Sequence, residues 1–423
     1  MRRETDSTGR SRPAIDKIVV IGTGFVGLPL ALQLAKAGKK VVGVDIDENL
    51  VQAINDQTLN LDEEELQTLL ESEEVDENLV ARTSPENGDA YVISVPTPLT
   101  EPQKSPDLSF VKAALESIIP YLEKDDVINI ESTIPPLTSD EVIVPMLQEA
   151  GFEPGDDVYL AHSPERILPG NVFEEIVHND RVIGGYTRNG SRAASEIYTP
   201  FLEGEVFYTD LISAELCKLI ENTFRDVNIA LANEFALIGR ELDVDMTEVI
   251  EVANRHPRVD ILNPGIGVGG HCLPVDPWFL NEVDPEHTNL ITTARRINDM
   301  MPEATARRIR HALADLDSPK VLALGAAYKP DTQDTRESPA MDIVDELRLN
   351  GYDITHKDRY VDGMAYNDLR TLLREVEPDA LVQLVNHSET AEELTALSAE
   401  PEYTDVLILR PGDENPLRPK SDV

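Results

Sequence analysis

The chain has 423 residues, of which 41% are hydrophobic, and its formal net charge is −42 at pH 7. This length exceeds one typical core and predicts two or three domains. No apolar run approaches the roughly 20 residues of a membrane helix, and two cysteines cannot form a disulfide framework. So acidic a chain lacks the basic face that nucleic acids require, so we expect neither a membrane nor a nucleic-acid partner.

The acidic residues recur along the chain instead of forming one tail. One interpretation is that they stay solvated or disordered. Helical patterning favours instead a folded protein whose surface suits molar salt, because screening removes the self-repulsion of its charges. Residues 1–14 are polar, lack the apolar core of a signal peptide and are expected to form a disordered tail. With only two cysteines, these features predict a halophilic, cytoplasmic protein.

The first half of the chain alternates strands with amphipathic helices. Strands are expected at 17–22, 40–47, 89–96, 126–133, 157–165 and 180–186. Strands that alternate with helices predict a doubly wound parallel sheet, here in a Rossmann-like NAD-binding domain over 15–205.

The pattern then becomes helical, first over 213–254 and again over 289–316. We assign a central helical domain to 206–316, with catalytic and dimerisation roles. Strand signals return at 319–330, 353–358, 379–387 and 405–412. The predicted fold class is α/β: two Rossmann-like domains joined by the helical one, the second over 317–423.

The first strand runs directly into the sequence GTGFVG and a helix, which gives Gly22, Gly24 and Gly27 the dinucleotide-binding spacing. Glycine allows the tight turn, the close approach of a pyrophosphate and close helix packing. Asp45 ends the second strand, where a carboxylate bonds the ribose of NAD and repels the 2′-phosphate of NADP. A purely structural glycine turn is the alternative, and the added Asp45 favours NAD.

A second group of glycines surrounds Cys272 in the sequence GVGGHCLPVDPWF. Glycine lets a backbone approach a ligand closely, so the thiol could reach a substrate as a nucleophile. Metal binding with His271 is the rival hypothesis, but no second Cys/His pair has zinc spacing, and we expect no metal. A small buried cysteine without chemistry is the other alternative.

Lys218, Asn222 and Arg225 share one face of a helix that is otherwise largely apolar. A polar stripe in such a helix indicates a site, although solvated helices also show polar faces. Lys218 could act as an acid or base, and Glu165 or Asp276 could position water. A nicotinamide site with a nucleophilic thiol predicts a four-electron oxidation through a thioester, using two NAD.

Eight segments in order resemble the UDP-glucose/GDP-mannose dehydrogenase family over nearly the whole chain. They are IGTGFVGLP, SVPTP, ESTIPP, SPERILPG, DRVIGGY, AELCKLIENTFRDVNIALANE, NRHPRVDILNPGIGVGGHCLPVDPWF and AAYKPDTQDTRESPAMDI. The C-terminal part resembles the family only loosely after Asp358. The resemblance implies an NAD-dependent UDP-sugar dehydrogenase that forms a homodimer or a higher homo-oligomer.

The resemblance also implies roles for individual residues. The implied catalytic residues are Cys272 as nucleophile, Lys218 as acid/base, Asn222 and Asp276 for the oxyanion, Glu165 for thioester hydrolysis and Thr133 for ordering water. The implied NAD contacts are Phe25, Val26, Asp45, Thr97, Thr133 and Arg336, the last in a neighbouring subunit. The implied nucleotide-sugar contacts are Arg166, Ile167, Lys218, Asn222, Arg225, His256, Arg258, Gly269, Tyr328 and Lys329.

The substrate prediction depends on a few positions within this resemblance. His271 and Val275 stand where the UDP-glucose branch usually has Ser and Lys, which favours the N-acetylhexosamine branch. The implied reaction oxidises C6 of UDP-N-acetyl-D-mannosamine to the uronate, for polysaccharide biosynthesis; UDP-N-acetylglucosamine and UDP-glucose are alternatives. Two rival classes are a single-step alcohol dehydrogenase, which needs no cysteine, and a non-catalytic nucleotide-sugar-binding protein.

Overall fold

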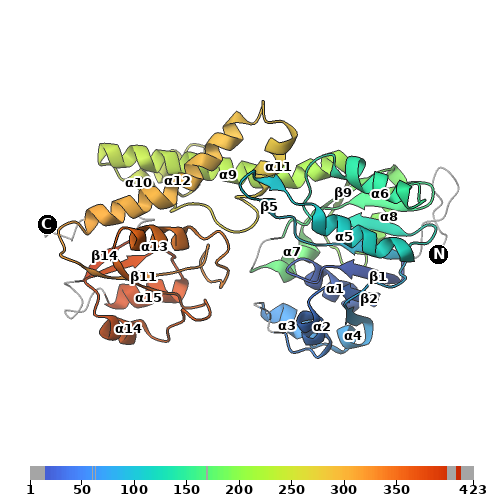
Figure 1. The fold of residues 1–423 in the computed structure, drawn as a ribbon, viewed down its shortest axis with the longest axis horizontal. Helices are drawn as coiled ribbons and strands as arrows, with labels where there is room; N and C mark the ends of the chain where they lie inside the picture. Colours follow the sequence, from blue (N-terminus) through green and yellow to red (C-terminus); the bar gives the residue numbers. More distant parts are fainter. Residues whose placement is uncertain (1–14, 60, 62, 168–169, 398–405, 411–423) are drawn as a thin grey trace. The chain divides into compact units, whose positions relative to one another are not determined.

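The computed structural model describes residues 15–59, 61, 63–167, 170–397 and 406–410 (Figure 1). The predicted tail at 1–14 lies outside the described residues. The chain divides into two compact units, Met1–Glu221 and Asn222–Val423. The predicted three-domain boundaries stay a prediction. Within the described ranges, no helix is both long and apolar enough to cross a membrane.

An eight-stranded sheet with the order β10-β9-β8-β7-β4-β1-β2-β3 forms the centre of the first unit. Its strands are β1 (Lys17–Ile21), β2 (Lys40–Val44), β3 (Leu79–Arg82), β4 (Ala90–Ile93), β7 (Val127–Ile130), β8 (Tyr159–His162), β9 (Arg181–Gly185) and β10 (Val206–Asp210). A separate hairpin pairs β5 (Leu99–Thr100) with β6 (Ser105–Pro106). The sequence did not predict β3 and β10, which are the two outermost strands of the sheet.

One pair of strands departs from the predicted parallel arrangement, because β9 pairs antiparallel with β8. A parallel connection requires a crossover that returns the chain to the opposite edge of the sheet. Here the connecting helix α7 (Val172–His178) contacts α1 (Gly27–Lys36) instead. The chain therefore re-enters the sheet at the edge where β8 ends. This reversal places Arg181, the first residue of β9, beside the carboxyl ends of β7 and β8.

Two hydrophobic clusters cover the two faces of this sheet. On β1, Ile18 and Val20 pack into one cluster while Val19 and Ile21 pack into the other, as the two-residue period of a strand requires. The helices contributing to the first cluster are α1, α2 (Glu48–Asn55), α3 (Glu64–Leu70), α4 (Glu73–Asn78), α7 and α8 (Arg188–Tyr198). The other face is covered by α5 (Ser109–Ile118), η1 (Ile119–Tyr121), η2 (Ser139–Ile143) and α6 (Val144–Glu149).

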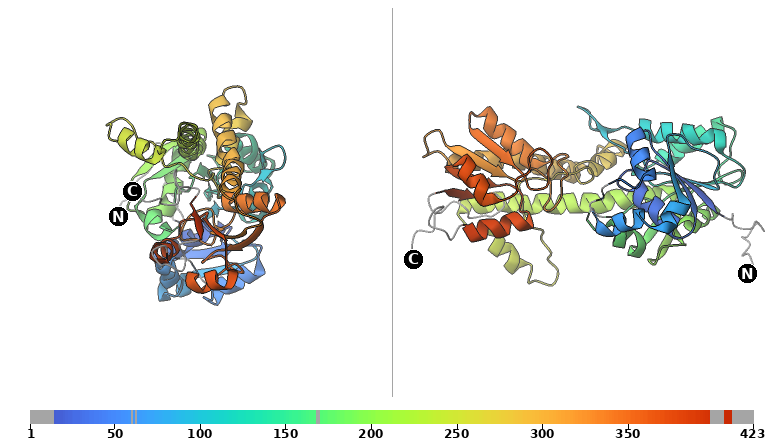
Figure 2. Two further views of the ribbon diagram at one scale, coloured as in Figure 1. Left: turned by 90° about the vertical axis from the view of Figure 1, so that its left-hand side faces the viewer. Right: turned by 90° about the horizontal axis from the view of Figure 1, so that it is seen from below.

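The helical region begins with α9 (Leu211–Leu242), one continuous helix of 32 residues (Figure 2). It ends at Asp243, which has a positive φ of 53°, and α10 (Met246–Ala253) follows. Two further helices are α11 (Asp276–Val283) and α12 (Asn289–Ala312). Between α10 and α11 lies a long loop that contains the glycines before Cys272.

The second unit also contains a parallel sheet, with the order β12-β11-β13-β14. The strands are β11 (Lys320–Leu324), β12 (Asp353–Lys357), β13 (Ala380–Gln383) and β14 (Leu407–Leu409). One face packs against α12 and α13 (Pro339–Leu349), and the other against α14 (Leu369–Val376) and α15 (Ser388–Leu397). In both units the carboxyl ends of parallel strands meet at one edge, where such folds bind ligands.

Candidate active site

The turn between β1 and α1 requires glycine at two of its three motif positions. Gly22 has a φ of 89°, and a Cβ there would lie 2.2 Å from the Ser94 carbonyl oxygen. A Cβ on Gly27 would lie 1.9 Å from the Gly22 carbonyl oxygen. Gly24, by contrast, has no atom within 4 Å of the Cβ position, so this side of the turn is open to a ligand.

Asp45 lies beside this turn at the end of β2. The Thr23 backbone N–H donates to Asp45 Oδ2 at 3.0 Å, which links the carboxylate to the turn. The N-cap residue of α1, Val26, makes no side-chain capping hydrogen bond, and the first turn of the helix contains no acidic residue. A pyrophosphate at this helix terminus and a ribose at Asp45 therefore fit the residues present.

The predicted cofactor loops after β4 and β7 are joined directly. Thr97 Oγ1 donates to the Thr133 carbonyl oxygen at 2.7 Å, and Ser132 Oγ donates to the Val95 carbonyl oxygen at 2.8 Å. The order β7-β4-β1-β2 makes Thr133, Thr97, the glycine turn and Asp45 neighbours along one sheet edge. Phe25 and Val26 lie in that turn, with Phe25 exposed.

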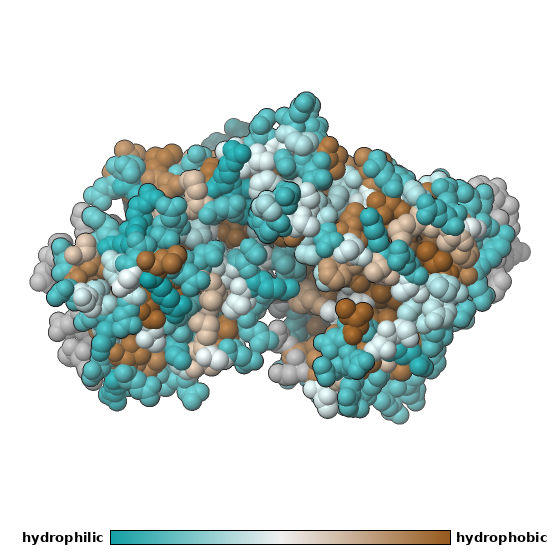
Figure 3. Space-filling view, in the orientation of Figure 1, coloured by the Kyte–Doolittle hydropathy of each residue, from teal (hydrophilic) through white to brown (hydrophobic). Residues whose placement is uncertain are grey.

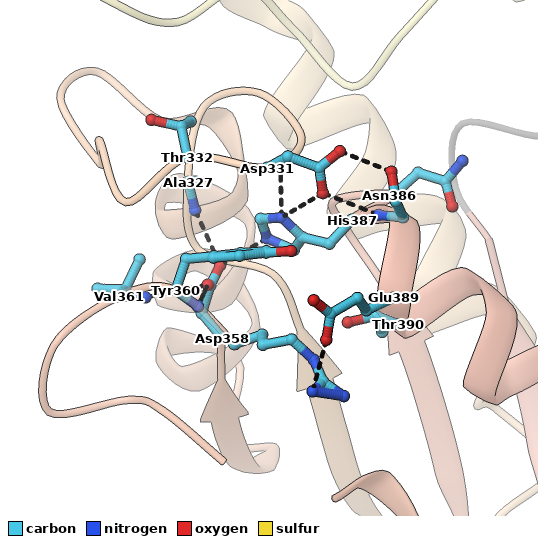
Figure 4. Close-up of polar contacts among 12 residues, drawn as sticks. Ala327, Asp331, Thr332, Asp358, Tyr360, Val361, Asn386, His387, Glu389 and Thr390 are labelled. Carbon is cyan, nitrogen blue, oxygen red and sulfur yellow. Dashed lines mark hydrogen bonds and ion pairs between the residues drawn. The ribbon is translucent and has the colours of Figure 1, made fainter. Parts of the chain in front are cut away.

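The equivalent edge of the second unit is filled by its own side chains (Figure 4). Asp358 follows β12 and is fully buried, and its Oδ2 accepts hydrogen bonds from the Ala326 and Ala327 amides. His387 Nε2 lies 3.0 Å from the same oxygen, and His387 Nδ1 accepts from the Asp331 amide at 2.9 Å. The groups that could hold a dinucleotide here are thus already paired, which assigns the dinucleotide to the first unit.

Glu165 follows β8 and meets the guanidinium of Arg181. Arg181 Nη2 donates to Glu165 Oε2 at 2.7 Å, while Nη1 donates to Glu131 Oε1 at 2.8 Å. Burial favours the protonated form of Glu165, but the Arg181 charge and the Arg166 amide hold its pKa below the ordinary value. Burial raises the pKa of Glu131 to about 8, against the opposing effect of Arg181.

Sequence reasoning assigned no role to Glu131 or Arg181, although both lay in quoted motifs. The sequence signal that could have identified them is a charged residue placed directly before or after an apolar strand. Their pairing depends on the antiparallel direction of β9, which the alternating pattern did not reveal.

Arg166 and Ile167 follow Glu165 at the same sheet edge. Arg166 forms a bidentate ion pair with Glu221 of α9, with 3.0 Å from Nε to Oε2 and 2.6 Å from Nη2 to Oε1. Ile167 is buried. Lys218 lies one helical turn before Asn222 on α9 and is half-buried.

In the second unit, the glycine loop packs tightly against the segment after β11. A Cβ on Gly269 would lie 2.7 Å from Tyr328 Cβ, and one on Gly270 would lie 3.0 Å from the Tyr328 ring. The Gly270 amide donates to the Arg336 carbonyl oxygen at 3.0 Å. The glycines thus bring the backbone beside Cys272, which is half-buried, to Tyr328 and Arg336.

Asp276 is the first residue of α11 and is 3% exposed. Its amide donates to the Cys272 carbonyl oxygen at 2.9 Å, and its Oδ2 accepts from Asn222 Nδ2 at 2.5 Å. Two predicted catalytic residues are therefore in direct contact, beside the turn that holds the third.

The other predicted contacts of this unit are less enclosed. Arg225 is exposed on α9, and His256 and Arg258 are exposed in the loop after α10. Lys329 Nζ lies 5.9 Å from the centre of the Tyr328 ring. Arg336 pairs with Asp334, at 2.9 Å from Nε to Oδ1 and 2.6 Å from Nη2 to Oδ2. The structure describes Lys218, Glu165 and Thr133 in the first unit and Asn222, Cys272 and Asp276 in the second.

The first unit has a dinucleotide-binding turn on a Rossmann-like sheet, and the second has a cysteine on a glycine loop. Together these features indicate an NAD-linked oxidoreductase. The family models agree. The NAD-binding domain of the UDP-glucose/GDP-mannose dehydrogenase family matches residues 16–202, its central domain 212–300 and its UDP-binding domain 322–407. The chain belongs to the UDP-glucose/GDP-mannose dehydrogenase family.

Individual relatives are similar over most of their length. A UDP-N-acetyl-D-mannosamine dehydrogenase of Methanococcus aeolicus is 46% identical over 380 residues, covering 89% of this chain and 85% of the relative. An NDP-N-acetyl-D-galactosaminuronic acid dehydrogenase of Ralstonia nicotianae is 43% identical over 339 residues, covering 78% and 79%. The solved UDP-D-ManNAc dehydrogenase of Pyrococcus horikoshii has a TM-score of 0.87 at 36% identity, covering 96% of this chain and 97% of that one.

These matches confirm the predicted family, the fold class, the assignment as a dehydrogenase and NAD as cofactor.

Proposed function

We propose that the chain catalyses the four-electron oxidation of the C6 hydroxyl of UDP-N-acetyl-D-mannosamine to the uronate. The observation that carries this proposal is the Cys272 loop, with Asp276 held by Asn222, in a chain with an NAD-binding turn. The relatives named as UDP-N-acetyl-D-mannosamine dehydrogenases support the substrate. NAD, when bound, supplies the oxidising power by accepting hydride.

The residues of the chain perform the acid–base and covalent work. Lys218 takes the proton of the C6 hydroxyl, and the Cys272 thiolate adds to the resulting aldehyde. Asn222 stabilises the oxyanion of the adduct, and Asp276 fixes the Asn222 amide. After the second oxidation the sugar is a thioester of Cys272, which water hydrolyses with Glu165 as base. Thr133 orders the water.

The nucleotide-sugar contacts are proposed on the same basis. Arg166, already aligned by Glu221, and exposed Arg225, His256 and Arg258 offer positive or donor groups to a diphosphate. Tyr328 and Lys329 offer an aromatic face and a charge in the part that matches the UDP-binding domain. Ile167 and Gly269 complete the proposed set, and Arg336 would act on NAD of a neighbouring subunit.

We also infer a homodimer. Large apolar side chains are exposed on one stretch of α9 and on α10: Phe224, Leu231, Ile238, Leu242, Val249 and Val252. Apolar groups in such numbers favour a covered surface. Sedimentation at several protein concentrations tests this, and a monomer at all of them contradicts it.

A cytoplasmic location at molar salt is the environment we propose. The face in Figure 3 is largely hydrophilic, and the first turns of α3 and α4 together carry Glu64, Glu65, Glu73, Glu74 and Asp76. The uronate product suits polysaccharide biosynthesis.

The deciding experiment measures NADH formed per sugar in molar KCl. UDP-N-acetylmannosamine, UDP-N-acetylglucosamine, UDP-N-acetylgalactosamine and UDP-glucose are offered separately. Two NADH per UDP-N-acetylmannosamine, with little from the others, is the expected result. One NADH per sugar excludes the thioester route, and two from another sugar changes the substrate. No NADH from any of them favours a non-catalytic binding protein.

A further inference from the structure

A buried charged cluster lies behind Glu165 in the first unit. Glu131 follows β7, Glu165 follows β8 and Arg181 begins β9, so three adjacent strands contribute to it. Glu131, Glu165 and Arg181 are 2%, 8% and 4% exposed, which makes Glu165 the most accessible of the three. A buried guanidinium shared by two carboxyl groups is costly to desolvate, and this cost is offset only where the ion pairs and hydrogen bonds have good geometry.

The guanidinium is held from its other side as well. The Arg181 guanidinium carbon lies 4.0 Å from the centre of the Tyr198 ring, and the Tyr198 hydroxyl accepts from Asn129 Nδ2 at 2.7 Å. Tyr198 and Asn129 are completely buried. The Tyr198 ring and the two carboxyl groups together hold the guanidinium in this orientation, in which each of its two outer nitrogens faces one carboxyl group.

The two carboxyl groups are not equivalent. Glu165 receives donors on both oxygens, because the Arg166 amide donates to Oε1 at 2.7 Å and Arg181 donates to Oε2. Glu131 receives Arg181 on Oε1, whereas its buried Oε2 has no hydrogen-bond partner among the residues that the structure describes. One positive charge balances one carboxylate, so the oxygen without a donor is the place where a proton is retained.

We propose that Arg181 and Glu131 are positioning residues for thioester hydrolysis: Arg181 holds Glu165 as an oriented carboxylate, and Glu131 is its neutral partner. This inference rests on the proposed function, because it concerns one step of that reaction. In this step water adds to the thioester carbonyl carbon and gives a proton to Glu165. The C–S bond breaks, and the proton passes to the departing Cys272 thiolate, which leaves a carboxylic acid and a free thiol.

Two variants separate positioning from a merely structural role. R181K keeps the charge but loses the planar fork, so Glu165 is misoriented. We expect kcat to fall about 100-fold, a typical effect of misplacing a catalytic group by about 1 Å. We expect the initial burst of two NADH per active site to persist, with an acyl adduct on Cys272 visible by intact-protein mass spectrometry. E131Q replaces the neutral acid with a neutral amide of the same shape, and kcat at pH 7 should stay within about threefold.

The pH profile provides a readout that packing alone does not move. The charged and titratable groups that face Glu131 are Arg181, Glu165 and Tyr198. Above about pH 8, Glu131 ionises, competes for Arg181 and repels Glu165. Hydrolysis by the wild type should therefore slow on the alkaline side, and E131Q should lack this decline.

A matched control is R359K in the second unit. Arg359 also bridges two glutamates, with 3.0 Å to Glu389 and 2.6 Å to Glu393. Its substitution should leave burst and steady-state rates unchanged.

The possible outcomes are distinct. An adduct in R181K, together with loss of the alkaline decline in E131Q, supports the proposal. Equal slowing of burst and steady state in R181K, or slowing by E131Q as severe as that by R181K, overturns it. If R181K does not fold, E131Q and its pH profile decide. A wild type that forms no NADH from any UDP-sugar overturns the proposed function itself, and this inference with it.

Discussion

Asn222 donates a hydrogen bond to Asp276 across 2.5 Å and thereby joins α9 to the first residue of α11. The Asp276 amide in turn bonds the Cys272 carbonyl oxygen, so the amide of Asn222 is connected through one residue to the turn that holds the thiol. Asp276 lies four positions after Cys272 in the sequence, whereas the side-chain donor to Asp276 lies on another helix.

Removing this amide should disturb catalysis more than folding. In N222A the buried Asp276 loses the hydrogen bond from Asn222, and the proposed oxyanion loses its stabilising group. We expect kcat to fall about 10²-fold or more, as for other oxyanion donors. The control is N228A, because within the described part of the chain the Asn228 side chain donates to the Phe224 carbonyl oxygen of its own helix. Steady-state NADH assays compare the two, and equal rates would contradict the role of Asn222.

The two cysteines provide a matched pair for testing covalent catalysis. C272S should lower the rate of four-electron oxidation about 10³-fold or more, because a serine hydroxyl is a far weaker nucleophile at neutral pH. C217S, by contrast, should retain near-normal turnover. NADH formation with UDP-N-acetylmannosamine measures both. Turnover of C272S within tenfold of the wild type would favour the single-step dehydrogenase.

The choice of cofactor should depend on the charge of Asp45. D45N preserves the shape of the side chain beside Thr23 but removes the negative charge that repels a 2′-phosphate. We expect KM for NAD to rise about tenfold, corresponding to one weakened hydrogen bond, and discrimination against NADP to fall. Parallel kinetics with NAD and NADP measure both effects. Unchanged discrimination between NAD and NADP would contradict the proposed contact of Asp45 with the ribose.

Asp358 should make the second unit sensitive to acid. Burial favours its protonated form, but the hydrogen bonds from His387 and the Ala326 amide hold its pKa well below the ordinary value. The folded state therefore prefers the ionised form. This stabilisation is fully present above about pH 4, the pKa in the unfolded chain, and is lost as the pH falls towards the folded value.

D358N should accordingly lower the free energy of unfolding by about 2 kcal/mol at pH 7 and weaken its acid dependence. Urea unfolding followed by fluorescence of Trp278, the one tryptophan of the chain, reports on this unit. The control is D353N, at an exposed position that begins β12. Equal losses of unfolding free energy in D358N and D353N would show that the hydrogen bonds of Asp358 do not contribute specifically to stability.

Salt should affect folding directly if the surface is adapted to it. With a net charge of −42, self-repulsion is strong at low ionic strength, where the Debye length is about 30 Å at 0.01 M salt. We expect circular dichroism to show partial unfolding at low KCl and full structure at molar KCl. Full structure and activity at both concentrations would contradict a halophilic origin.

Several parts of the fold and of the site can be predicted from local patterns in the amino-acid sequence. The strand–glycine–helix pattern with Asp45 predicted the dinucleotide turn, and the alternation of strands and helices predicted both sheets. These features are local, because a glycine spacing or an apolar period is fixed by the nearest residues. The same holds for Cys272 and Asp276, which one helical turn places together.

Contacts between groups that are distant in the sequence depend instead on how the helices and strands pack. The contact of Asn222 with Asp276 depends on how α9 meets α11, and the pairing of Glu131 with Arg181 depends on the reversal of β9. Strand direction leaves no signal in the sequence here, because β8 and β9 are buried on both faces, as the parallel strand β7 is. The charge balance around Glu165 could therefore be read only from the folded chain.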